Sequence, residues 1–275
     1  MRIAVTGSTG KLGAVVVGYL RDAGHEVVGM DRTGTRGEGF LFVDVSDYGQ
    51  VVDAFHEGGR FDALVHLAAI PAGGIAPEVE TFHNNMLSTF NVFQAARRAG
   101  IQTIAYASSE TLLGIPFDSA PPYLPVDEDY DSRPESMYAV VKHLEEELAQ
   151  KLVRWDDSLS ITALRFSNVM VEEDYDGFAA FTPDNRRWNL WGYIDARDAA
   201  QAILLSIERA QPGFDRFVIA NAETVLDVPS AQLVADFWPE VPVKRELDGT
   251  ESLLSIEKAR LELGYQPRFG WTASR

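Results

Sequence analysis

Val5-Thr6-Gly7-Ser8-Thr9-Gly10-Lys11-Leu12-Gly13 is the stretch that decides the fold. An apolar run precedes it, and apolar residues at helical spacing follow it (Leu12, Val15, Val16, Tyr19, Leu20). This order predicts a strand, a glycine turn and a helix. Glycines allow a tight turn and close backbone approach, and a helix N-terminus presents free N–H groups and a partial positive charge. The stretch therefore predicts a site for the diphosphate of a dinucleotide.

An acidic residue ends the next predicted strand, Glu26-Val27-Val28-Gly29-Met30-Asp31. A carboxylate at that position accepts hydrogen bonds from the adenosine ribose and repels a 2′-phosphate, so Asp31 favours NAD over NADP. Arg32 and Arg36 follow closely and could bind a 2′-phosphate instead.

The composition is that of an acidic globular protein without cysteine. The 275 residues include 41 acidic and 24 basic side chains, for a net charge of −17, and 46 % are hydrophobic. The charge disfavours nucleic acid and anionic membranes as partners, and no apolar run approaches the ~18 residues of a membrane span. Because the start lacks a signal-peptide pattern and the chain lacks cysteine, we expect a cytoplasmic enzyme that binds no metal.

Strand and helix patterns alternate through the first part of the chain. We expect strands at 2–6, 26–31, 40–43, 62–67, 101–106, 160–166 and 216–220, and helices at 11–23, 47–57, 77–99, 137–153, 195–209, 229–236 and 255–263. This alternation predicts an α/β protein, a doubly wound Rossmann-type parallel sheet with a small C-terminal α/β substrate-binding lobe. Gly24 and Gly100 are placed to end helices.

We expect a cofactor domain over 1–167, with 195–220 packing back on it, and a lobe formed mostly by 168–275. The connection 107–134 is long and follows a strand end, where such sheets bind ligands, so it is expected to form an active-site wall. Within it, Asp127-Glu128-Asp129 is expected to be a solvated loop. His66 is expected to end a buried strand, and Asp195 and Asp198 to cap and orient the next helix.

Tyr138 and Lys142 are four residues apart on a predicted helix, so their side chains share one face. A nearby ammonium stabilises a phenolate and lowers the pKa of the tyrosine, which lets it act as a general base. The pair follows Ser108-Ser109, at the end of the fifth strand, by one long loop.

With these residues the chain resembles the extended short-chain dehydrogenases/reductases, the NAD-dependent epimerase/dehydratase family. The matching motifs run from residue 3 to about 270, nearly the whole chain. Besides those above, they comprise Asp44-Val45, His66-Leu67-Ala68-Ala69, Asn85, Leu164-Arg165-Phe166-Ser167-Asn168, Tyr193-Ile194-Asp195-Ala196-Arg197-Asp198 and Lys258-Ala259-Arg260-Leu261-Glu262-Leu263-Gly264-Tyr265.

The resemblance implies a role for each site residue. Tyr138 is the acid/base, Lys142 holds the nicotinamide ribose, Ser109 bonds the reacting oxygen with Ser108 as the competing choice, and Asn85 supports a proton relay or the main chain beside the nicotinamide. It places the cofactor against Gly7, Thr9, Gly10, Lys11, Leu12, Gly13, Asp31, Arg32, Asp44, Val45, Leu67, Ala68, Ala69, Tyr138, Lys142 and Phe166. It places the substrate against Ser109, Glu110, Asn168 and Arg187.

The substrate is expected to be a sugar or a sugar derivative. Glu110-Thr111 lacks the second carboxylate of the dehydratases of this family, which disfavours dehydration. The small lobe favours a simple sugar or sugar-acid dehydrogenase, and the alternative is a nucleotide-sugar 4-epimerase. An outside alternative is a non-catalytic NAD-sensing regulator. By resemblance we also expect a homodimer that pairs through the helices 77–99 and 137–153.

Overall fold

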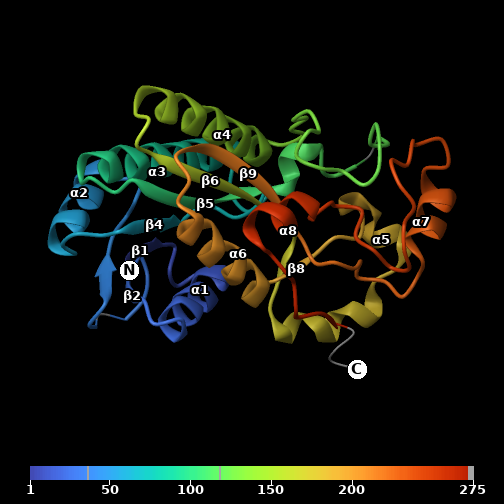
Figure 1. Cartoon of the computed structure of the whole chain (residues 1–275), viewed down its shortest axis with the longest axis horizontal. Coiled ribbons are helices and arrows are strands. Elements are labelled where there is room, and N and C mark those ends of the chain that lie inside the picture. Colours follow the sequence, from blue (N-terminus) through green and yellow to red (C-terminus); the bar gives the residue numbers. More distant parts are fainter. Residues whose placement is uncertain (36, 118, 272–275) are drawn as a thin grey trace.

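A fully parallel seven-stranded sheet forms the centre of the computed structural model, which describes residues 1–35, 37–117 and 119–271 (Figure 1). The strand order is β3-β2-β1-β4-β5-β6-β9. The strands are β1 (Arg2–Thr6), β2 (Glu26–Asp31), β3 (Phe40–Phe42), β4 (Ala63–His66), β5 (Thr103–Ser109), β6 (Ser160–Phe166) and β9 (Gly213–Ile219). Because all of them are parallel, their carboxyl ends meet at one edge, which is where such sheets bind ligands.

Helices cover both faces of the sheet, as Figure 1 shows. One face carries α1 (Lys11–Asp22) and α6 (Ala196–Arg209), and the other carries α2 (Tyr48–Glu57), α3 (Glu78–Arg98) and α4 (Met137–Trp155). Each face has its own apolar core. The predicted doubly wound Rossmann-type sheet is therefore confirmed.

Local sequence signals set the helix boundaries. Helix α1 is followed by Gly24 at φ +85°, and α3 by Gly100 at φ +77°. Both glycines adopt the left-handed conformation that ends helices, as predicted. Ser136 caps α4 by accepting a hydrogen bond from the amide of Ala139, and Asp195 caps α6 through the amide of Arg197.

Two strands have bounds that differ from the prediction: β5 begins and ends later in the sequence, and β9 begins and ends earlier. The strand expected at 101–106 is Thr103–Ser109, so it carries both serines to the ligand-binding edge. The strand expected at 216–220 is Gly213–Ile219. Neither shift changes the topology.

The remaining elements gather beyond the carboxyl edge of the sheet, except the last helix, which packs against α6 and β9 (Figure 1). They are β7 (Val169–Met170), η2 (Glu172–Ala180), α5 (Pro183–Arg186), η3 (Arg187–Asn189), β8 (Ile194–Asp195), α7 (Ser230–Phe237) and α8 (Glu257–Leu263). Their buried residues continue the core that lies under α1 and α6. The chain enters this lobe after β6, returns to the sheet through α6 and β9, and enters the lobe again.

The connection after β5 is packed against the lobe. It begins with η1 (Glu110–Leu113), and further along Val126 donates its amide to the carbonyl of Leu253 at 2.8 Å. The expectation of a solvated loop at 127–129 is wrong for Glu128, which is 7 % exposed and accepts the amide of Val218 at 2.7 Å. The reason is that β9 is an edge strand, so its amide needs an acceptor from outside the sheet.

None of the helices in the described residues is long and apolar enough to cross a membrane.

Candidate active site

The glycine turn between β1 and α1 leaves no room for side chains. A Cβ on Gly13 would lie 2.0 Å from the carbonyl oxygen of Gly7, and one on Gly7 would lie 2.6 Å from the amide nitrogen of Ala68. Gly7 also has φ +69°, a conformation that favours glycine. Gly10 caps α1 without any side-chain hydrogen bond, and the first turn of the helix carries no acid. The free N–H groups of this helix terminus suit a diphosphate.

Asp31 lies beside this turn, at the end of β2. Its carboxylate accepts the backbone amide of Thr9 at 3.1 Å, which fixes it at the edge of the sheet. Arg32 is exposed. Arg36, the other cation expected near a 2′-phosphate, lies outside the described residues.

The segments after β3 and β4 complete this side of the edge. Asp44 accepts the hydroxyl of Ser46 at 2.7 Å, which lowers the pKa of the carboxyl, and Val45 is buried. The amides of Leu67 and Ala68 lie 3.3 and 3.5 Å from the hydroxyl oxygen of Thr6. The structure thus brings the predicted nucleotide residues to one edge, Ala69 following directly in the chain.

Two predicted residues of the first turn of α1 have other contacts as well. Lys11 forms an ion pair of 2.5 Å with Asp174 of η2, so η2 lies against the start of α1. The side chain of Leu12 packs against the core under α1, which leaves its backbone amide as the group available to a cofactor.

Ser109, Tyr138 and Lys142 meet where β5 ends against α4. The hydroxyl of Ser109 lies close enough to the phenol of Tyr138 to favour its ionised form. The ammonium of Lys142 lies 5.7 Å from the centre of the Tyr138 ring and donates to the carbonyl of Ala107 at 2.8 Å. All three side chains are at most 7 % exposed.

Lys142 is also ion-paired with Glu145, at 2.9 Å and fully buried. Burial by itself lowers the pKa of Lys142, but Glu145 and Tyr138 outweigh it, so the pKa is raised and the side chain is an ammonium. Burial raises the pKa of Tyr138; Lys142 opposes this rise and Glu145 adds to it. The expectation that the ammonium lowers the pKa of Tyr138 is therefore wrong as a net effect, because burial and a second charge oppose it.

The neighbouring serine has a different environment. Ser108 donates to Glu146 at 2.7 Å, and Glu146 forms a buried ion pair with Arg165 at 2.8 Å. Ser109 instead lies at Tyr138. Of the two serines, Ser109 is thus the one whose hydroxyl faces the acid/base candidate, although its catalytic role stays a prediction.

Asn85 holds a backbone segment beside the site, and Phe166 lies at the end of β6. Asn85 is fully buried, accepts the amide of Ile70 at 2.8 Å and donates to its carbonyl at 3.0 Å. This geometry matches the second of its two expected roles, support of the main chain. Phe166 is buried at the end of β6, in register with Ser109.

Glu110 lies next to Ser109 and is buried, which raises the pKa of its carboxyl to about 7. The amide of Asn189 donates to one carboxyl oxygen at 3.2 Å. The hydroxyl of Ser167 and the backbone of Asn168 also lie close enough to the carboxyl of Glu110 to oppose this rise, and the amide oxygen of Asn189 is buried without a hydrogen bond. These groups form a polar cluster next to the catalytic candidates.

Of the adjacent Arg186 and Arg187, the structure brings Arg186 rather than Arg187 toward this cluster. Arg186 is 6 % exposed, donates to the carbonyl of Gly192 at 2.9 Å, and its charge acts on Glu110. Arg187 is exposed and lies 6.0 Å from the ring of Phe237. The substrate contact expected of Arg187 stays a prediction.

Sequence reasoning missed Glu145 and Asn189, and of the adjacent Arg186 and Arg187 it chose Arg187. The one available signal was the spacing of Glu145, three residues after Lys142, which places both on one helical face. Nothing in the sequence distinguished it from Glu146 and Glu147.

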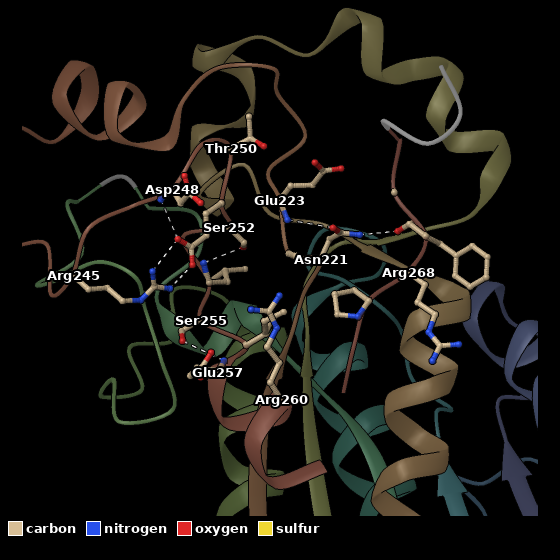
Figure 2. Close-up of a pocket in the computed structure, with 17 residues that line it drawn as sticks. Asn221, Glu223, Arg245, Asp248, Thr250, Ser252, Ser255, Glu257, Arg260 and Arg268 are labelled. Atoms are coloured by element: carbon tan, nitrogen blue, oxygen red, sulfur yellow. Dashed lines mark hydrogen bonds and ion pairs between the residues drawn. The ribbon is translucent and has the colours of Figure 1, made fainter. Parts of the chain in front are cut away.

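A polar cavity of about 550 Å³ lies in the lobe, and none of the catalytic candidates lines it (Figure 2). Three arginines line it with four acids: Arg245, Arg260, Arg268, Glu223, Asp248, Glu251 and Glu257. Arg245 is ion-paired with Glu251, as the dashed lines in Figure 2 show. Because these acids outnumber the bases, the cavity has no net positive charge for a phosphate group.

The parallel sheet and the glycine turn define a nucleotide-binding α/β protein, and Ser109, Tyr138 and Lys142 meet at the carboxyl edge of its sheet. Residues 3–220 match the model of the NAD dependent epimerase/dehydratase family, and the chain belongs to that family. It is thus an enzyme of the extended short-chain dehydrogenase/reductase type.

Known relatives agree with this assignment. The chain is 25 % identical to the UDP-glucose 4-epimerase of Corynebacterium glutamicum over 97 % of this chain and 91 % of that protein. It is 27 % identical to the UDP-glucose 4-epimerase of Bacillus subtilis over 61 % of this chain and spans about half (52 %) of that relative. A short-chain dehydrogenase/reductase superfamily protein from Agrobacterium tumefaciens, solved with bound NAD, shares the fold with a TM-score of 0.74 at 23 % identity, over 99 % of this chain and 94 % of that one.

Proposed function

We propose that this enzyme uses NAD to interconvert a nucleotide sugar and its epimer at one hydroxyl-bearing carbon. Two curated relatives are UDP-glucose 4-epimerases, which favours the epimerase alternative over the simple dehydrogenase that the small lobe suggested. The observation that carries the proposal is the meeting of Ser109, Tyr138 and Lys142 at the carboxyl edge of the sheet that bears the glycine turn.

The glycine turn and Asp31 would hold the cofactor. The missing Cβ atoms and the uncapped start of α1 suit the diphosphate, and Asp31 suits an unphosphorylated ribose. Bound there, NAD would supply the chemistry of accepting and returning a hydride.

Side chains of this protein move the hydroxyl proton, which leaves the sugar together with the hydride. As a phenolate, Tyr138 takes the proton of the sugar hydroxyl while the carbon loses its hydrogen as hydride. The hydroxyl of Ser109 donates to the oxygen as it becomes a carbonyl. The keto sugar then has to turn so that its opposite face receives the hydride, and in this return step the phenol of Tyr138 gives the proton back to the oxygen. Burial favours the neutral phenol and raises the pKa of Tyr138, and Lys142 opposes this rise by stabilising the phenolate that the first step needs.

A net dehydrogenase of a free sugar or sugar acid is the second candidate. It is favoured by Arg186, whose guanidinium is stacked on the rings of Phe181 and Trp188 at 4.7 and 5.1 Å and bonded to a backbone carbonyl. The guanidinium makes this one hydrogen bond and its Nε is buried without one, so it keeps donors that suit the carboxylate of a sugar acid.

One experiment tests the proposal and separates the two candidates. The enzyme is incubated with NAD and either a UDP-hexose or a free uronic acid, and both NADH and the epimeric sugar are measured. An epimerase forms the epimer without accumulating NADH, whereas a dehydrogenase accumulates NADH. Tyr138→Phe is expected to keep NAD binding and to lose turnover by about 10²- to 10⁴-fold. Turnover that survives in this variant would show that Tyr138 is not the base.

We also propose that the active form is a homodimer joined through α3 and α4. These adjacent helices expose apolar side chains that a monomer would leave in water: Val79 67 %, Leu87 50 %, Phe90 42 % and Leu144 37 %. An interface between two copies would bury them.

A further inference from the structure

A buried chain of hydrogen bonds joins the glycine turn to Lys142. It runs through the side chains Thr6, His66, Thr89 and Glu145, which come from β1, β4, α3 and α4. The successive contacts measure 2.7 Å, 3.1 Å, 2.8 Å and, from Glu145 to Lys142, 2.9 Å. Every member is at most 3 % exposed.

The hydrogen bonds in this series all donate in the same direction, from Thr6 toward Glu145. The hydroxyl of Thr89 donates to Glu145, so its oxygen accepts the Nε2 hydrogen of His66. The Nδ1 atom of His66 then has a free lone pair and accepts the hydroxyl of Thr6, whose oxygen faces the amides of Leu67 and Ala68. This pattern requires a neutral His66, and burial does lower the pKa of His66 to about 3.

The end point of the chain is a carboxylate that no step of the proposed reaction uses. One oxygen of Glu145 receives Thr89 and the other receives Lys142. Lys142 therefore spends one N–H on Glu145 and one on Ala107, and one N–H is left for a ribose hydroxyl. Glu145 thus fixes the position of the ammonium and limits how many of its N–H groups are free to donate.

We propose that Glu145 is a positioning residue: held by the Thr6–His66–Thr89 chain, it fixes the ammonium of Lys142 and offsets part of its charge toward Tyr138. The inference rests on the proposed function, because the proposed function assigns Tyr138 and Lys142 their catalytic roles. It goes beyond that function by naming the residue that sets how strongly the ammonium acts on the phenol.

The charged and titratable groups that face this pair come from several elements. On α4 and on the elements packed against it they are Glu146 of α4, Tyr106 of β5, His66 of β4 and Glu110 of η1. Glu146 is held by Arg165, and Tyr106 is neutral because burial raises its pKa. Glu145 is therefore the negative charge in direct contact with Lys142, and its removal should make the phenol of Tyr138 more acidic.

The test compares Glu145→Gln with Glu147→Gln. Glu147 lies on the same helix, is half-exposed and pairs with Lys151, so its variant changes one charge without touching the buried chain. The NMR signal of the ¹³Cζ-labelled Tyr138, identified by its loss in Tyr138→Phe, reports the titration of the phenol. We expect Glu145→Gln to lower its pKa by about one unit and Glu147→Gln to leave it unchanged. A pKa that is unmoved or raised in Glu145→Gln would overturn the proposal.

A second measurement follows the direction of the chain. In Glu145→Gln the carboxamide oxygen should face Lys142, so its NH₂ group faces Thr89 and the donation through His66 reverses. The ¹⁵N spectrum of His66 should then change from the Nε2–H to the Nδ1–H tautomer. If His66 has the same tautomer in the wild type and in Glu145→Gln, His66 is not part of the support for Glu145.

Thr89→Val and Thr89→Ser keep the proposal testable if Glu145→Gln does not fold. The valine removes the hydrogen bond that holds one oxygen of the Glu145 carboxylate, so the pKa of Tyr138 should differ from the wild-type value, whereas serine should restore that value. Equal titrations in the two variants would contradict the role of the chain. Neither NMR readout needs a substrate, so a failure of the proposed function, in the form of no turnover on any sugar, is distinguishable from a failure of this inference.

Discussion

Replacing Gly13 with alanine tests the nucleotide site with a change of one methyl group. The new Cβ would lie 2.0 Å from the carbonyl oxygen of Gly7 and 2.9 Å from the Cα of Ser8, and these neighbours are backbone atoms that cannot rotate away. Real Cβ contacts essentially never fall under 3.0 Å, so α1 must move from the turn by about 1 Å. Such overpacking costs about 1–3 kcal/mol of folding free energy.

The same movement removes backbone donors from the reach of the diphosphate. Hydrogen bonds from N–H groups need donor–acceptor distances of about 2.7–3.2 Å, and bonds to charged groups contribute about 1.5–3 kcal/mol each. Loss of one or two of them weakens NAD binding by roughly 100-fold. Titration calorimetry measures the affinity, and a thermal melt measures the stability.

Gly18→Ala is the matched control, because Gly18 lies in the same helix with nothing within 4 Å of its missing Cβ. Alanine is the better helix former, so this variant should gain about 1 kcal/mol and melt roughly 2–4 °C higher, with unchanged NAD affinity. If Gly13→Ala binds NAD as tightly as Gly18→Ala does, the turn does not hold the diphosphate and the reasoning is wrong.

Three further predictions concern charge and association. Burial raises the pKa of Glu110 from 4.5 to about 7, so the folded state binds its proton more tightly than the unfolded state, and the free energy of unfolding should fall by about 3 kcal/mol as the pH rises through that window. Urea unfolding at about pH 5 and pH 8 should show this fall in the wild type and a smaller one in Glu110→Gln; equal falls would contradict it. Asp31→Asn removes the charge that repels a 2′-phosphate, so the affinity for NADP relative to NAD should rise about tenfold in calorimetry, and an unchanged ratio would exclude Asp31 from the ribose. Leu87→Arg places a charge on the exposed face of α3 and should halve the mass measured by light scattering; a wild type that is already monomeric would refute the proposed dimer.

The sequence was sufficient for the fold and for the residues whose roles depend on local spacing. The strand–glycine–helix order near residue 10 and the four-residue spacing of Tyr138 and Lys142 are properties of adjacent segments, and they hold wherever those segments lie in space. The motif order then gave the topology, because parallel strands joined by helices have few permitted arrangements.

Contacts between distant segments could not be read in this way. Glu145 differs from Glu146 and Glu147 only in the side of α4 on which it lies, and its partner Thr89 is on another helix. Likewise Glu128 looked like part of a polar loop, and only the position of β9 at the sheet edge explains its burial. A buried charge depends on its partner, and the partner is set by tertiary structure.

The path of the chain through the lobe limits how this enzyme can be re-engineered. Because α6 and β9 lie between the two segments that form the lobe, residues 168–193 and 220–271 reach it separately and share one core. Exchanging the lobe for that of another family member therefore requires exchanging both segments together, since either one alone would lose the packing surface that the other provides.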